Sequence, residues 1–198
     1  MAYFQSETRE LVNLDSCDLI QSQFGLASDY RASVALDFLA EVSDQLLPSA
    51  EPGEKFFRLL VAVLEALRKD TAAGPWCAVT YFSYWAARLS GWLPELDVCL
   101  GCGSSLDDVE TPERAFFSRG QPGLVCGHCR GAVGAGGAWE LSAESRATAR
   151  DMARQPLAQV AAAGWTQAKA ADLRRFLVSQ IEAHVERKLV TVSLLEAG

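Results

Sequence analysis

Four cysteines arranged as two C-x-x-C pairs constrain this chain more than any other feature. Cys99 and Cys102 lie in "CLGCG", Cys126 and Cys129 lie in "CGHC", and the full pattern is C-x2-C-x23-C-x2-C. Each C-x-x-C turn lets two thiolates converge on one ion, and zinc takes sulfur ligands at about 2.3 Å in a tetrahedron. The pattern therefore predicts one zinc ion held by four cysteines.

Other uses of paired cysteines fit this pattern less well. A dithiol redox centre needs only one C-x-x-C, usually at a helix N-terminus beside a strand, and neither pair has that context. Structural disulfides are rare in the cytoplasm, which is the compartment indicated by a first decapeptide, "MAYFQSETRE", without a basic and apolar leader. Four thiolates leave no coordination position open, so we expect a structural ion and not a catalytic one.

The turns around the cysteines also carry informative small and polar residues. Gly101 and Gly103 flank Cys102, at positions where a tight turn can require a positive φ angle. His128 lies between the second pair of cysteines. Because four thiolates already complete the coordination shell, we expect His128 to face solvent.

Apolar residues recur at helical spacing over most of the remaining chain. Helices are predicted from Ser28 as N-cap, after the loop at 48–54, after Pro75 with Gly91 as C-cap, from about Ser142, and over roughly 167–189. The predicted buried face of the second helix consists of Phe57, Leu60, Val61, Leu64 and Leu67. Inside the cysteine segment, "RAFFS", "RGQPG" and "LVC" predict a strand, a turn and a strand.

Charge is distributed unevenly along this chain of net charge −7. Residues 1–110 carry 7 basic and 17 acidic side chains, a balance of −10, whereas residues 111–198 carry 11 and 8, a balance of +3. Such asymmetry is typical of a nucleic-acid-facing half beside an acidic one. The candidate phosphate-binding residues are Arg146, Arg150, Arg154, Arg174, Arg175, Arg187 and Lys188. From the residues alone, a solvated helix face explains this set equally well.

The order of these features resembles the RecO family of DNA repair proteins. Three helices precede "GWLPELDVCLGCG", in which Gly91, Pro94 and Leu96 stand before Cys99 at the family's spacing; "FFS", "GLVCGHC", a small-residue stretch and "IEAHVERKL" follow. The resemblance covers about residues 8–192 of the chain. It implies a recombination mediator and not an enzyme. Such a mediator binds single- and double-stranded DNA, anneals complementary strands, and with RecR helps to load RecA onto strands coated by single-stranded-DNA-binding protein.

The resemblance also assigns roles to individual residues. The positions that match zinc ligands of many relatives are Cys99, Cys102, Cys126 and Cys129, and those that match a basic closing pattern are His184, Arg187 and Lys188. The expected location is the bacterial cytoplasm, at the nucleoid. No apolar run has the ~18–20 residues that a membrane span needs, so we expect no membrane partner.

The chain departs from the family at its N-terminus. The family begins with a five-stranded OB barrel, whereas residues 1–26 offer only "AYF" and "ELVNL" as strands, so roughly sixty residues of the barrel are expected to be missing. The predicted fold is therefore mainly α: a helical bundle with an inserted four-cysteine, ribbon-like zinc finger and remnant strands of a truncated OB barrel. The predicted domains are the barrel remnant at 1–26 and a helical domain at 27–198 with the zinc finger at 97–133.

Two other classes of function stay open at this stage. The acidic first half and the missing barrel favour a zinc-stabilised interaction scaffold that docks proteins without binding DNA. A metal- or thiol-dependent enzyme is the third class, but the sequence contains no plausible Ser-His-Asp set, H-E-x-x-H motif or phosphate-binding P-loop. Salt-sensitive binding of single strands is the property that separates the mediator from the scaffold.

Overall fold

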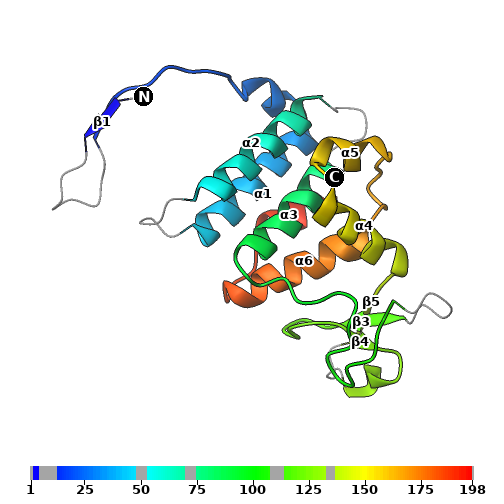
Figure 1. Cartoon of the computed structure of the whole chain (residues 1–198). Helices are drawn as coiled ribbons and strands as arrows, with labels where there is room; N and C mark the ends of the chain where they lie inside the picture. Colours follow the sequence, from blue (N-terminus) through cyan, green and yellow to red (C-terminus); the bar gives the residue numbers. More distant parts are fainter. Residues whose placement is uncertain are drawn as a thin grey trace.

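Helices account for most of the structure, and a small three-stranded sheet lies at one end of them (Figure 1). This computed structural model describes residues 2–4, 13–47, 53–69, 75–107, 114–132 and 137–197. In chain order the elements are β1 Ala2–Phe4, β2 Asn13–Ser16, the 3-10 helix η1 Phe24–Ser28, α1 Tyr30–Leu46, α2 Glu54–Lys69, α3 Trp76–Leu89, β3 Ala115–Phe117, β4 Val125–Cys126, the 3-10 helix η2 Cys129–Ala132, β5 Trp139–Leu141, α4 Ala143–Arg154, α5 Leu157–Ala162, α6 Ala171–His184 and α7 Thr191–Ala197. The mainly α fold class is confirmed. Among the described residues, no helix combines the length and the apolar character needed to cross a bilayer.

Helix α3 is the central element of the bundle. It is buried along nearly its whole length and contacts α1, α2, α4, α5 and α6. Phe82 of α3 is fully buried and makes edge-to-face contacts with Phe38 of α1 and Phe56 of α2, with ring centroids 6.3 and 5.7 Å apart. Such pairs stabilise a core beyond the area that they bury. The predicted bundle of the first three helices is therefore present.

The buried face of α2 differs from the predicted one. The helix buries Phe56, Leu59, Val63 and Leu67, whereas Phe57 is 65% exposed and Val61 is 39% exposed. Apolar residues surround most of this helix, so two overlapping i, i+3, i+4 frames are possible in the sequence. Packing against α3 selects a face that includes the predicted Leu67, keeps Leu60 and Leu64 partly buried at its edge, and leaves Phe57 and Val61 exposed.

Local capping sets the ends of the first and third helices. Helix α1 begins one residue later than predicted, because the Asp29 side chain accepts a hydrogen bond from the Ala32 N–H while Ser28 belongs to η1. Helix α3 ends as predicted at Gly91, which has φ +75°. The N–H groups of Gly91 and Trp92 donate to the carbonyls of Arg88 and Ala87. This is a Schellman motif, which satisfies the last carbonyls of a helix.

The C-terminal helices are shorter and more numerous than predicted. Helix α4 starts at the predicted cap, Ser142, whose hydroxyl accepts from the Ser145 N–H. The single helix predicted over 167–189 is instead α6, Ala171–His184, bounded by the positive φ angles of Ala170 and Glu186. A separate helix, α7, follows it. The apolar periodicity continues through the Glu186 turn, which explains why the predicted helix runs past His184, and α7 lies beyond its predicted end.

The sheet carries the cysteine segment and packs on the bundle. Strands β3 and β4 pair antiparallel as predicted, and β5 adds a third strand, giving the order β4-β3-β5. Strand β5 spans only three residues, too few to produce a recognisable period. Phe117 of β3 contacts Phe176 of α6 edge-to-face at 5.1 Å, which fixes the sheet against the helices.

Two short strands lie apart from the bundle at the N-terminal end. Strands β1 and β2 pair antiparallel, are exposed at every residue, and lie at the end of an arm away from the helices (Figure 1). The first matches the predicted "AYF" strand. The predicted "ELVNL" strand starts outside the described residues, and the observed strand is Asn13–Ser16. Their interpretation as a barrel remnant stays a prediction.

A carboxylate latch holds the last helix on the first. Glu41 of α1 accepts hydrogen bonds from the N–H groups of Val190 and Thr191 and from the Thr191 hydroxyl. Burial raises the pKa of Glu41, but these hydrogen bonds and the charge of Arg187 outweigh it, so the net pKa lies below its usual value. The ionised form is therefore the one that stabilises the docked α7.

We predict that Glu41→Ala lowers the free energy of unfolding by about 1–2 kcal/mol, as loss of a helix cap does. Because the folded-state pKa is lowered, the wild type should lose this advantage as pH falls below 4.5 through that pKa. Urea denaturation at pH 7 and at acid pH measures both effects. Asp37→Ala, on an exposed site of the same helix, is the control. An equal loss in the two variants at pH 7 would contradict the latch.

Candidate metal centre and basic cleft

The four predicted cysteines converge at the tip of the sheet. Their sulfur atoms all lie within 4.8 Å of one another, and the Cys102 and Cys126 sulfurs are 3.8 Å apart. A tetrahedron with metal–sulfur bonds of about 2.3 Å has edges of about 3.8 Å. The donor set and its spacing therefore fit a tetrahedral metal ion. Cys17 and Cys77 lie outside this cluster.

Backbone turns rather than regular structure bring the first cysteine pair into place. The Cys99 N–H donates to the Ser104 carbonyl and the Gly103 N–H donates to the Cys99 carbonyl, which closes a tight turn. Gly103 has the predicted positive φ, +73°, whereas Gly101 does not. Gly101 is required for space instead, since a Cβ there would lie 3.0 Å from the Cys129 sulfur.

The thiols of the cluster ionise unequally, and a bound cation would favour the thiolate form of all four. Burial raises the pKa of the Cys99 thiol, but backbone N–H groups, led by that of Cys126 at 3.2 Å, outweigh it and lower the pKa to about 6. Neighbouring sulfurs of Cys102 and Cys126 raise the pKa of Cys129 to about 12. The first thiolates thus form readily, and their charge opposes ionisation of the last. A divalent cation at the centre removes this opposition. His128 is exposed, as predicted.

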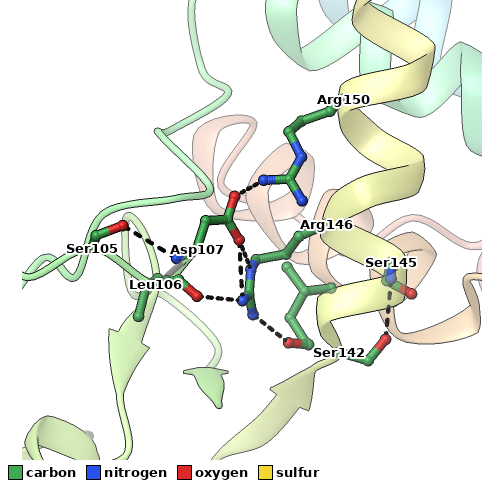
Figure 2. Close-up of polar contacts among 8 residues, drawn as sticks. Ser105, Leu106, Asp107, Ser142, Ser145, Arg146 and Arg150 are labelled. Carbon is green, nitrogen blue, oxygen red and sulfur yellow. Dashed lines mark hydrogen bonds and ion pairs between the residues drawn. The ribbon is translucent and has the colours of Figure 1, made fainter. Parts of the chain in front are cut away.

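Arg146 lies inside the protein. Its side chain is 1% exposed, although its spacing from Arg150 and Arg154 predicted a surface stripe. Figure 2 shows its guanidinium between α4 and the loop that follows the first cysteine pair. It donates to the carbonyls of Leu106 and Leu141, at 2.7 and 3.2 Å, and to the Asp107 carboxylate at 3.3 Å. Burial lowers its pKa. Arg146 is therefore a structural residue, which corrects its assignment to a phosphate-binding surface.

Arg150 and Arg154 line a cleft of about 360 Å³ between α3, α4 and the segment after α3. Arg150 forms an ion pair with the second oxygen of Asp107 (Figure 2). Arg154 is exposed, and within the described ranges no hydrogen bond or ion pair engages it. Arg88 of α3, which the sequence analysis missed, lines the same cleft and donates to the Tyr84 hydroxyl at 3.0 Å. Its place in the cleft depends on the packing of α4 beside α3, so no local pattern in the sequence marked it.

The remaining predicted cations occupy two other places. Arg174 and Arg175 line a pocket of about 690 Å³ formed by α1, α3, α6 and α7. Arg174 is half-buried over the Trp76 ring, 5.1 Å from its centroid, and burial lowers its pKa to about 10. Arg187 and Lys188 follow α6 and are exposed. The predicted cations therefore do not form one continuous face.

We predict that Arg146→Leu lowers the free energy of unfolding by about 3–5 kcal/mol, the usual cost of breaking a buried charge pair. The variant leaves the carbonyls of Leu106 and Leu141 without their donor and leaves Arg150 as the remaining cationic partner of Asp107. The exposed neighbour provides the matched control: Arg154→Leu should change stability by less than about 0.5 kcal/mol. Guanidinium denaturation followed by circular dichroism measures both. Similar stability of the two variants would contradict the structural assignment of Arg146.

Comparison with known proteins places this architecture in a family. A sequence model of the family described as "Recombination protein O C terminal" matches residues 27–192, which include the bundle, the cysteine cluster and the cleft. The "DNA repair protein RecO" of Koribacter versatilis is 44% identical over 194 residues, covering 98% of this chain and 75% of that protein. The protein of the same name from Anaeromyxobacter dehalogenans (strain 2CP-C) is 29% identical over 187 residues, covering 94% and 70%. This chain belongs to the RecO family of DNA repair proteins.

Proposed function

We propose that this protein is a recombination mediator that binds single- and double-stranded DNA, anneals complementary strands and helps to load RecA. Its partners would be RecR and single-stranded-DNA-binding protein, and it would act in the bacterial cytoplasm at the nucleoid. The mechanism is non-covalent: cations hold the strands while the helical domain recruits proteins. No side chain acts as acid, base or nucleophile in this scheme.

This proposal rests on the cleft between α3, α4 and the segment after α3, which we call the basic cleft. Arg88, Arg150 and Arg154 line one hollow, and two of them, Arg88 and Arg154, are exposed. The hollow is also lined by the exposed carboxylates of Glu95 and Asp97. One guanidinium group donates two parallel hydrogen bonds to the oxygens of one phosphate. A strand that lies along the cleft would place its phosphates within reach of these arginines. Arg175, Arg187 and Lys188 would add contacts elsewhere on the surface. We propose the same domain boundaries as the sequence predicts: a barrel remnant at 1–26 and a helical domain at 27–198, which holds this cleft and the zinc finger at 97–133.

Single-stranded DNA binding at ~50 and ~200 mM salt tests the proposal. We expect affinity to fall steeply with salt, and Arg154→Gln to reduce the slope of log K against log salt by about 0.7, the value for one phosphate contact on a single strand. Arg58→Gln is the matched control, since Arg58 is exposed but pairs with Glu54 on α2. If the folded wild-type protein does not bind single-stranded DNA at ~50 mM salt, the mediator proposal is wrong.

The cysteine cluster would hold one structural Zn²⁺ through Cys99, Cys102, Cys126 and Cys129. A closed set of four thiolates supplies folding energy and no chemistry. Asp107, the partner of Arg146 and Arg150, follows Cys102 by only five residues. The metal would thus fix the loop that positions two cations of α4.

We predict that Cys99→Ser abolishes stoichiometric zinc and lowers the melting temperature together, because metal binding contributes directly to folding. Elemental analysis, with iron measured alongside zinc, and thermal denaturation give the two readouts. Cys17→Ser serves as control, since Cys17 is exposed and outside the cluster. Loss of zinc with an unchanged melting temperature would contradict a structural ion.

A zinc-stabilised scaffold without DNA binding is the alternative function. The observation that favours it is the exposed apolar side of α2, where Phe57 and Val61 lie one turn apart. Exposed apolar surface of this kind is typical of protein docking sites. The salt titration above separates the two functions, because a scaffold alone would show no DNA binding.

A further inference from the structure

Two aromatic rings lie face to face where α3 and α6 end. The ring centroids of Trp92 and His184 are 4.8 Å apart and their planes are inclined by only 9°. Trp92 is half-buried and His184 is exposed. Trp92 covers one face of the imidazole, and His184 as a residue is exposed. The outer ring of the stack is therefore carried by a surface residue.

Both rings are held in place before any ligand arrives. The backbone N–H of Trp92 donates to the Ala87 carbonyl at 2.8 Å within the Schellman motif that ends α3, which fixes the backbone that carries the indole, and the indole itself stacks on His184. The His184 Nδ1 lies 2.8 Å from the Gln180 carbonyl, one turn earlier in α6. Helices α3 and α6 pack extensively on each other. A ligand that stacks on this surface therefore meets an ordered platform and loses little affinity to side-chain ordering.

The platform adjoins two groups of cations. Leu93, the residue after Trp92, lines the basic cleft together with Arg88 and Arg154. Arg187 and Lys188 follow His184 within four residues, a distance of at most about 14 Å along the chain. Both are exposed. Aromatic surface flanked by cations matches a chain of bases joined by phosphates.

We propose that Trp92 and His184 form a stacking platform for an unpaired nucleobase of a single strand whose phosphates lie in the basic cleft. This inference rests on the proposed DNA-binding function and deepens it. Every base has a π face, so the platform tolerates any sequence. In a duplex the base faces are covered by their neighbours. The platform therefore selects single strands over duplexes, whereas the cations of the cleft attract both.

The test compares two polymers that differ only in their bases. Labelled oligothymidylate of about 20 nucleotides and an abasic deoxyribose-phosphate chain of the same length are titrated at ~50 mM salt. Trp92→Leu should weaken oligothymidylate binding about ten-fold, within the range for one stacked base. Binding of the abasic chain should not change. Trp92→Phe keeps an aromatic ring and should restore most of the affinity.

His184→Ala and His184→Phe repeat the comparison at the exposed ring, where substitution does not disturb the end of α3. The alanine variant should weaken binding of oligothymidylate alone, and the phenylalanine variant should not. Unchanged oligothymidylate affinity in the alanine and leucine variants would overturn the platform, as would equal losses on both polymers. A wild type that binds neither polymer would instead refute the DNA-binding function on which the inference rests.

Discussion

The contact between Arg146 and Asp107 joins the cysteine segment to the helical bundle. A guanidinium removed from water is stabilised only when its donors are satisfied, and here a carboxylate and two carbonyls accept from it. Asp107 belongs to the loop after the first cysteine pair, and Arg146 belongs to α4. The same carboxylate pairs with Arg150, so one acidic side chain fixes the cysteine segment and orients a wall of the cleft. The cysteine segment and the basic cleft thus share Asp107 as a common contact.

Features that depend on neighbouring residues were predictable from the sequence. The cysteine cluster was predicted from two C-x-x-C turns and the hairpin between them, each of which has a local sequence pattern. The cluster and the hairpin are present. The caps at Ser142 and Gly91 were equally local. The hydrogen bonds that define the turns and caps join groups within a few residues of one another, and the hairpin pairs Ala115 with Cys126 across a single short connection. Contacts with distant parts of the chain therefore had little influence on whether these turns, caps and this hairpin formed.

Features that depend on a distant partner were not predictable in the same way. Periodicity places Arg146, Arg150 and Arg154 on adjacent turns of a helix, but it does not say which of them faces the protein interior. That depends on Asp107, 39 residues before Arg146 and on a loop. On α2, two apolar frames compete, and the packing surface of α3 selects between them. Arg88 escaped notice because its relevance arises only when α4 packs beside α3.

The negative net charge of the chain is compatible with a nucleic-acid surface, because attraction is set locally. At 0.1 M salt, charges separated by more than about 10 Å are largely screened from each other. Acidic residues such as Asp15 lie on the exposed arm away from the bundle (Figure 1). The cleft itself is lined by four arginines and three acidic residues, and its most enclosed carboxylate, Asp107, is already engaged by Arg146 and Arg150. Of the other lining charges, Arg88 and Arg154 are exposed, as are Glu95 and Asp97. A strand bound at Arg88 and Arg154 must therefore keep its phosphates away from these two carboxylates.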